Sequence, residues 1–106
     1  MILTGKAKED FLEYYNNHSI KYLLSWTDFD DLPLVVKNAL IIEWFDSISV
    51  FIQDLGFIHN VGNVPAGFDI SVSYKGRLYQ DFEFQKSRQK AIEKAIKKAN
   101  EIYNNL

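Results

Sequence analysis

The hydrophobic period of this chain changes near Ser47, inside the stretch LPLVVKNALIIEWFDSISVFI (residues 32–52). Before Ser47 the apolar residues form a nearly unbroken run, which is typical of a helix buried on most of its surface. After Ser47 the β-branched and aromatic residues indicate a strand, with alternation at period two in Ile48, Val50 and Ile52. The chain must therefore place a strand directly after a helix.

The corner between the two falls at EWFDS, residues 43–47. Large aromatic side chains are usually buried, so we expect Trp44 and Phe45 to lie in the core. Asp46 and Ser47 have short polar side chains that bond the backbone groups left free where a helix ends. We therefore interpret this segment as structural and not as a binding site.

The central helix is predicted to begin near Pro33 and to run to about Asp46, with Asp30 or Asp31 as its N-cap. Its polar residues do not gather on one face, as they would on a surface helix. These residues are Lys37, Asn38, Glu43 and Asp46. Either the rest of the domain surrounds this helix or a second subunit covers it.

The N-terminal segment has the apolar spacing of a short amphipathic helix over residues 6–17. Thr4 precedes it, and its hydroxyl is a candidate acceptor for the first free backbone N–H groups. Residues 16–26 contain both helix-favouring leucines and turn-favouring asparagines. The type of this second segment therefore stays open.

The C-terminal half carries a strand pattern and then a helix pattern. A turn-rich loop at 59–67 precedes residues 68–74, which alternate like a strand with one buried and one exposed face. The last segment predicts a helix with Ser87 as its N-cap. Its apolar residues at helical spacing are Ile92, Ala95, Ile96, Ala99, Ile102, Tyr103 and Leu106.

The strand RLYQDFEF, residues 77–84, is the hairpin partner of residues 68–74. A two-residue turn at Lys75 and Gly76 would pair Ile70 with Asp81 and place a charge on the core face. A three-residue connection or an equivalent bulge keeps the apolar residues together. We therefore predict the register that pairs Tyr74 with Leu78, Val72 with Gln80, Ile70 with Phe82 and Phe68 with Phe84.

The order of these elements predicts an α+β fold, helix-helix-β-β-β-helix. Its sheet is a three-stranded antiparallel meander with the helices packed on one face. A length of 106 residues with 47% hydrophobic residues fits a single domain, 1–106, with one core.

Composition limits the compartment and the partners. The chain has no cysteine, which excludes disulfides and thiolate chemistry and is typical of a reducing cytoplasm. We expect a soluble cytoplasmic protein without an export signal, because charges begin at Lys6 and acidic residues interrupt the most apolar window. A net charge of −2 provides no global field that would attract nucleic acid.

Residues that could carry catalysis or bind a metal are few. Asp28, Asp30 and Asp31 offer oxygen ligands, but a calcium loop needs a longer run closed by a glutamate, so helix capping is the better interpretation. His18 and His59 are the only histidines and lack a paired motif. We expect no enzyme, no cofactor and no metal.

The last helix carries the best candidate contact surface. Lys86, Lys90, Lys94 and Lys97 fall near one of its faces, and Arg88 lies beside them. Such a row can meet phosphates, although a solvated helix face is the commoner explanation. We expect ordinary i,i+4 ion pairs of Lys97 with Glu93 and Glu101.

Segments of this sequence resemble two known groups of proteins. The segment DISVSYKGRLYQDFEFQKSRQKAIEKAIKKA resembles the second half of a double-stranded RNA-binding domain, which would make Lys86, Arg88 and Lys90 contacts to phosphate. The words WFDS and SRQKA, within about half of the chain, make it similar to short uncharacterised proteins of bacteriophages and prophages. The second resemblance is the better one and implies an origin, but no activity.

Two functional hypotheses and one weaker alternative follow. The first is a small non-enzymatic phage-type protein that binds another protein or itself, with a homodimer through residues 34–45 as one form. The second is nucleic-acid binding, of the double-stranded RNA kind, through the basic face of the last helix. The third is an enzyme with an acidic site at residues 28–31.

Overall fold

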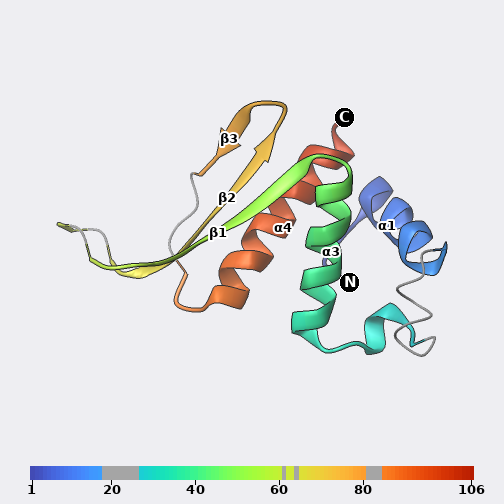
Figure 1. Cartoon of the computed structure of the whole chain (residues 1–106), viewed down its shortest axis with the longest axis horizontal. Coiled ribbons are helices and arrows are strands. Elements are labelled where there is room, and N and C mark those ends of the chain that lie inside the picture. The colour runs from blue at the N-terminus through green and yellow to red at the C-terminus, as the bar shows by residue number, and fades with distance from the viewer. Residues whose placement is uncertain (18–26, 61, 64, 81–84) are drawn as a thin grey trace.

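The computed structural model describes residues 1–17, 27–60, 62–63, 65–80 and 85–106. The expected α+β fold and antiparallel meander are confirmed, with strand order β1-β2-β3 (Figure 1). In chain order the elements are α1 (Gly5–Asn17), the 3-10 helix η1 (Phe29–Asp31), α3 (Leu34–Ser47), β1 (Val50–Ile58), β2 (Gly67–Tyr74), β3 (Arg77–Tyr79) and α4 (Arg88–Asn104). Of the segment left open, residues 18–26 lie outside the described residues.

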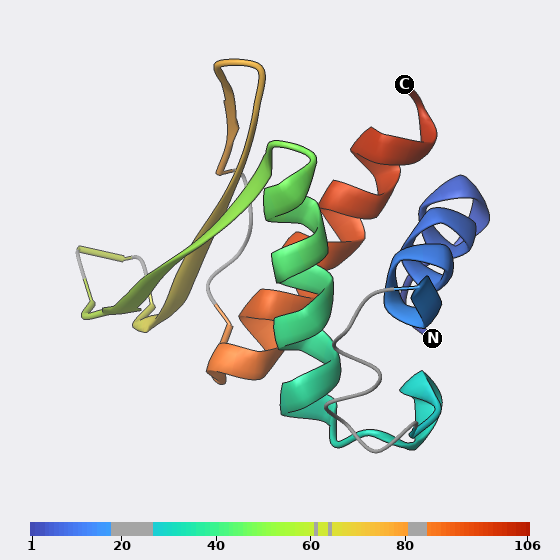
Figure 2. The ribbon, with the colours of Figure 1, turned by 45° about the vertical axis from the view of Figure 1, so that its right-hand side comes forward.

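The helices and the sheet form layers. Helices α3 and α4 pack on one face of the sheet, as expected, and α1 packs on these two helices on the side away from the sheet (Figure 2). The hairpin of β1 and β2 extends beyond the helices and makes the molecule long (Figure 1). Its longest dimension is 48 Å and its shortest is 18 Å. The other face of the sheet is therefore not covered by any of these helices.

The core is one cluster of buried side chains to which helices and strands contribute. Aromatic rings from α1, η1 and α3 meet in it edge to face. The ring of Phe11 lies 4.8 Å from that of Phe29 and 5.7 Å from that of Trp44. Trp44 and Phe45 are 4% and 0% exposed, which confirms that the aromatic pair belongs to the core.

Helix α3 is surrounded largely by its own chain. Leu40 and Ile41 are buried together with the aromatic pair, and α1, β1 and α4 all contact this helix. Even Asn38 is buried, and its Nδ2 donates to Oε1 of Gln89 at 3.0 Å. In its first turn, however, Leu34 and Val35 are 49% and 60% exposed, so a homodimer through residues 34–45 stays a prediction.

Helix α3 begins near Pro33, as predicted, but its cap differs from the prediction. Asp30 and Asp31 belong to η1, and Pro33 is the N-cap without a side-chain hydrogen bond. Leu32 is extended, with φ −77° and ψ 152°, because a residue before proline avoids the helical region. This extended residue separates the two aspartates from the first turn of α3, so their predicted capping role was wrong.

The N-terminus of α1 is capped from another helix. The N–H of Ala7 donates to Oδ1 of Asn104 at 2.8 Å, and Nδ2 of Asn104 donates to the carbonyl of Thr4 at 2.9 Å. A Cβ at Gly5 would lie 3.2 Å from Nδ2 of Asn104, so glycine permits this close approach. The role expected of the Thr4 hydroxyl is thus taken by Asn104, and the hydroxyl accepts from Nδ2 of Asn100.

The corner after α3 is confirmed. Oγ of Ser47 donates to the carbonyl of Trp44 at 2.6 Å, as expected for a polar residue at a helix end. The side-chain bond expected of Asp46 does not form among the described residues, and its backbone carbonyl accepts instead from the N–H of Ser49 at 3.1 Å. Ser49 has φ 62°, a left-handed conformation that reverses the chain into β1.

The predicted register of the second hairpin was wrong. β2 and β3 pair Tyr74 with Arg77 and Val72 with Tyr79 across a two-residue turn. Lys75 and Gly76 have φ values of 49° and 79°, the geometry of a type I′ turn that matches strand twist.

This register places Arg77 on the helix-facing side of the sheet, where its guanidinium lies over the ring of Tyr79. β3 ends at Tyr79, and Asp81, whose charge the prediction avoided, lies outside the described residues. Pairing resumes at Phe68 with Gln85, whereas a continued ladder would reach Phe68 with Glu83. The pairings expected for Phe82 and Phe84 fall on residues outside the described part.

Candidate interaction surfaces

Helix α4 presents an apolar side to the protein and a basic side to solvent. Oγ of Ser87 accepts from the N–H of Lys90 at 3.2 Å, which confirms the predicted cap. Ala91, Ala95 and Ala99 are buried, and their small side chains let the helix lie close to its neighbours. The helix ends at Asn104, so Leu106, expected on the apolar side, is instead 70% exposed.

The basic face of α4 is formed by Lys90, Lys94 and Lys97, which are all exposed. Together with Gln85 and Glu93 they line a shallow hollow of about 180 Å³. Lys86 is also exposed and lies just before the cap. The structure therefore brings together three of the five predicted contact residues and places a fourth at the start of the same helix.

Arg88, the fifth of these residues, is directed to the sheet instead. Its Nε lies 2.9 Å from Oδ2 of Asp54 on β1, and its guanidinium lies 5.1 Å from the ring centroid of Phe68 on β2. A cation that is already paired with a carboxylate has less to gain from a phosphate. The basic face is thus narrower than the sequence indicated.

The predicted i,i+4 ion pairs of Lys97 are not the ones that form. Nζ of Lys98 pairs with Oε1 of Glu101 at 3.5 Å, an i,i+3 contact. Among the described residues, Lys90, Lys94 and Lys97 have no carboxylate within 4.0 Å. Their charges are therefore available to an anion from outside.

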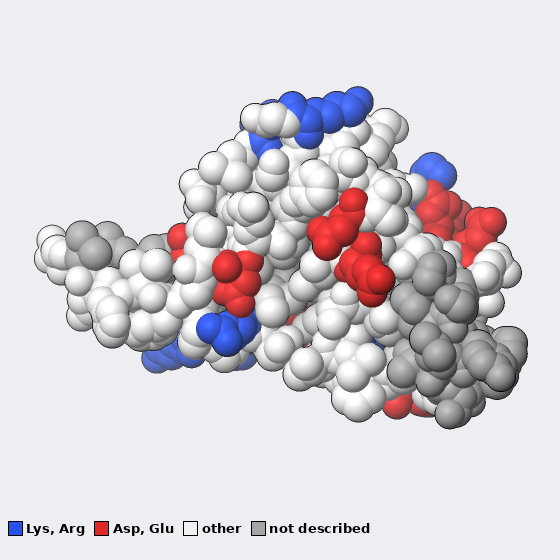
Figure 3. All heavy atoms as spheres, viewed as in Figure 1, with Lys and Arg blue, Asp and Glu red and all other residues white. Residues whose placement is uncertain are grey.

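Charge is separated along the chain and over the surface. Eight of the twelve Lys and Arg residues lie between positions 75 and 98, and nine of the fourteen Asp and Glu residues lie between positions 9 and 54. On the face drawn in Figure 3, carboxylates gather over α3 and α1 while Lys and Arg lie towards the edges. Although the net charge of the whole chain is −2, its C-terminal third is basic.

The face of the sheet away from the helices carries exposed apolar side chains near the β2–β3 turn, whereas Ser71 on the same face is buried. The register aligns Phe51 of β1 with Ser73 of β2 and Ser73 with Leu78 of β3. Directly paired residues point to the same side of a sheet, and Val50, Ile52 and Val72 point to the helices. Phe51 and Leu78 are 44% and 54% exposed. We name the four residues Phe51, Gln53, Ser73 and Leu78 the outer patch.

β1 is an edge strand, and part of its edge is interrupted. A register shift between Asp54 and Gly56 leaves Leu55 bulged, and Oδ1 of Asp54 accepts from the N–H of Gly56 at 2.9 Å. Bulges bend an edge away from another strand and so discourage unspecific pairing. The regular portion of the edge before the bulge, residues 50–54, lies beside the outer patch.

The outer patch was missed in the sequence, although one signal for it was present. The alternation of Val50 and Ile52 already placed Phe51 on the opposite face of β1. The wrong register put Leu78 beside Tyr74 on the core face, because a shift of one residue reverses every side chain of a strand. Phe51 and Leu78 could not be assigned to the same face of the sheet without the correct turn at Lys75 and Gly76.

The candidate catalytic and metal-binding residues do not form a single site in the described part of the chain. Asp28, Asp30 and Asp31 border a hollow of about 300 Å³, and no group of three possible ligands able to hold a metal occurs among the described residues. The ring of His59 lies 5.1 Å from that of Phe57 on the protruding hairpin, far along the chain from these aspartates. His18 lies outside the described residues.

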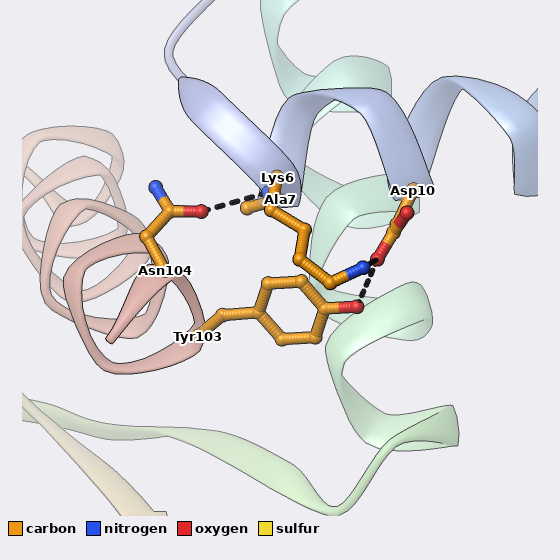
Figure 4. Close-up of polar contacts among 5 residues, drawn as sticks. All are labelled: Lys6, Ala7, Asp10, Tyr103 and Asn104. Atoms are coloured by element: carbon orange, nitrogen blue, oxygen red, sulfur yellow. Dashed lines mark hydrogen bonds and ion pairs between the residues drawn. The ribbon is translucent and has the colours of Figure 1, made fainter. Parts of the chain in front are cut away.

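A polar cluster joins α1 to α4 and is structural. Nζ of Lys6 pairs with Oδ2 of Asp10 at 2.8 Å, and the hydroxyl of Tyr103 donates to the same oxygen (Figure 4). The hydrogen bonds from Lys6 and then Tyr103 hold the pKa of Asp10 below its usual value. Burial, followed by the bond to Asp10, raises the pKa of Tyr103.

One carboxylate on α3 is shifted the other way. Burial, and then the nearby charge of Glu43, raises the pKa of Asp46. The two carboxylates lie on the exposed side of the helix, where they form part of the acidic surface. This arrangement repels anions from α3 and is unlike the surface of α4.

Comparison with known protein families, with curated proteins and with solved structures finds no match for this chain. The resemblances to phage proteins and to double-stranded RNA-binding domains therefore stay predictions. None of the helices in the described part of the chain is long and apolar enough to cross a membrane.

Proposed function

We propose that this chain acts by binding another protein through the outer patch, without catalysing a reaction. The observation that carries the proposal is the exposure of Phe51 and Leu78 on the two strands that flank Ser73, on the face of the sheet away from the helices. Exposed apolar side chains grouped on one face mark interaction surfaces more often than scattered ones do.

The chemistry of the patch specifies the kind of partner. Phe51 and Leu78 are apolar, and Gln53 and Ser73 are polar but uncharged. A partner surface that fits them is flat, apolar and uncharged, so binding should depend little on salt. The resemblance to phage and prophage proteins makes bacterial proteins the first partners to test.

The test is capture of partners from a nuclease-treated bacterial lysate by the tagged chain. The double variant Phe51→Ser, Leu78→Ser should lose a partner that the wild type retains at both low and high salt. The charge-reversed variant Lys90→Glu, Lys94→Glu should keep that partner. A thermal melt of each variant establishes that it is folded, since partly exposed side chains contribute little to the core.

Two results would contradict the proposal. One is capture of the same partner by the folded double serine variant. The other is a partner that is released by salt and lost with the two lysines.

The second candidate function is nucleic-acid binding, and the specific observation in its favour is the unpaired basic face of α4. Lys90 and Lys97 are two turns apart and Lys94 lies between them, a spacing that suits successive phosphates. Fluorescence anisotropy with double-stranded RNA and DNA tests it. Log affinity should fall with log salt at a slope of about −3, one counterion for each of the three lysines.

The variant Lys90→Glu, Lys94→Glu should abolish this binding. Lys8→Glu, an exposed charge reversal on α1, is the matched control and should change it little. Equal effects of the two changes would show that binding follows net charge and not the basic face.

A further inference from the structure

A second recessed surface lies at the opposite end of α4 from its N-cap. The hairpin of β2 and β3 leans against the last turns of the helix and leaves a hollow of about 350 Å³ between them. Its lining includes two tyrosines, two cations and two aliphatic side chains. They are Tyr74, Arg77, Tyr79, Lys98, Ile102 and Leu106, and the carboxylate of Glu101 and the amide of Asn105 complete the lining.

The two cations of this hollow are held by an aromatic ring. The guanidinium of Arg77 lies 4.8 Å and Nζ of Lys98 lies 5.1 Å from the ring centroid of Tyr79. Contacts of this kind attract a cation to a ring without neutralising its charge. Tyr79 therefore keeps both charges at the wall of the hollow.

The charges of the hollow are only partly balanced. Lys98 pairs with Glu101 at 3.5 Å, and its side chain is 29% exposed against 64% for Glu101. Arg77 has no carboxylate within 4.0 Å among the described residues. A guanidinium that rests on a ring and lacks a carboxylate presents its N–H groups to an incoming anion.

The remaining wall is apolar. Tyr74, Ile102 near the end of α4 and Leu106 just beyond it contribute the apolar part of the lining, and Leu106 is 70% exposed. Such a wall favours a ligand with a ring or an aliphatic body over a bare ion. The volume of about 350 Å³ is at the lower end of the range for small-molecule sites.

We propose that this hollow binds a small amphipathic anion, with its carboxylate or phosphate on Arg77 and Lys98 and its apolar body against Tyr74, Ile102 and Leu106. The outer patch lies on the other face of the sheet, so this inference does not depend on the protein-binding proposal.

The test is a titration of the ¹⁵N-labelled chain followed by NMR. The probes are adenosine 5′-monophosphate and 3-phenylpropionate, each paired with its uncharged counterpart, adenosine and 3-phenylpropanamide. We expect the anions to shift resonances of the hollow and to bind about tenfold more tightly than their uncharged counterparts. Preference for one anion identifies phosphate or carboxylate as the natural group, and either result supports the proposal.

Two variants separate the site from a general charge effect. Arg77→Gln should weaken binding about tenfold, because it removes the unpaired cation. Arg88→Gln, the matched change at an arginine outside the hollow, should leave binding unchanged.

The proposal is overturned if no probe shifts the hollow, if inorganic phosphate binds as tightly as the nucleotide, or if both arginine variants behave alike. The ¹H–¹⁵N spectrum of each variant shows whether it is folded. If Arg77→Gln is not, Arg77→Lys, which keeps one charge but loses the planar donors, should weaken binding by a smaller factor.

Discussion

Asn104 connects two helices that are far apart in the sequence. Its amide caps α1 by accepting from Ala7 and donating to Thr4, and no local pattern around residue 4 reveals this. A cap of this kind differs from one made by the preceding serine or threonine because it forms only when the helices dock. Local rules for helix ends therefore predicted the Ser87 cap and failed at α1.

Replacement of Asn104 by alanine should lower the free energy of unfolding by about 1 kcal/mol, the usual contribution of a helix cap. Chemical denaturation measures the change. Asn63→Ala, an exposed asparagine in the loop between β1 and β2, is the matched control and should stay within about 0.5 kcal/mol of the wild type. Equal losses at the two positions would show that the bonds of Asn104 are not a cap.

Asp10 and Asp46 should change the pH dependence of stability in opposite directions. The pKa of Asp10 is lowered in the folded chain, so its carboxylate adds stability above its ordinary pKa, and this stability is lost as the pH falls. The pKa of Asp46 is raised, so its ionisation costs stability as the pH rises through the folded-state pKa.

Asp10→Asn should therefore be less stable than the wild type at pH 7, and Asp46→Asn should be more stable. The difference for Asp46→Asn should vanish well below the ordinary carboxyl pKa, and the difference for Asp10→Asn should vanish only at a still lower pH, because the pKa of Asp10 is lowered in the folded chain. Urea unfolding at a series of pH values checks both. Differences of the same sign at pH 7 would contradict the account.

At the scale of elements, the sequence predicted what depends on hydrophobic period. The switch near Ser47, the strand at residues 68–74 and the last helix all follow from spacing, and the structure confirms them. The cap of α3 and the hairpin register were predicted incorrectly, because they depend on backbone conformation at Leu32 and Lys75. A lysine in the left-handed region is uncommon, so the sequence does not indicate this backbone conformation at Lys75.

The type I′ turn at Lys75 and Gly76 can be tested by two substitutions with opposite effects. Gly76→Ala should lower the free energy of unfolding by about 1 kcal/mol, because a residue with a Cβ is strained at a φ of +79°. No steric clash adds to this cost, because the Cβ would touch nothing within 4 Å. Lys75→Asn should raise it by about 0.5 kcal/mol, because asparagine favours the first position of this turn. Thermal or chemical melts measure both.

Nuclear Overhauser contacts between Val72 and Tyr79 would confirm the register directly. Contacts of Val72 with Gln80 instead would restore the three-residue connection and contradict the turn.

At the scale of the whole molecule, two helices cover one face of a small sheet, and none of the described helices covers the other. The sequence predicted this layering, but the outer patch needs the register of three strands at once, and one incorrect turn hid Leu78. The basic face of α4 was predicted from helical spacing alone, and only the diversion of Arg88 to Asp54 required the structure. Helical faces are thus easier to predict than patches that cross strands.

The claim that the uncovered face of the sheet binds the partner is tested most directly by NMR mapping of the ¹⁵N-labelled chain against the captured protein. The account predicts that the largest changes occur at Phe51, Gln53, Ser73 and Leu78, and that they persist at high salt. Changes confined to Lys90, Lys94 and Lys97, with the outer patch unaffected, would contradict it and would assign binding to the basic face of α4.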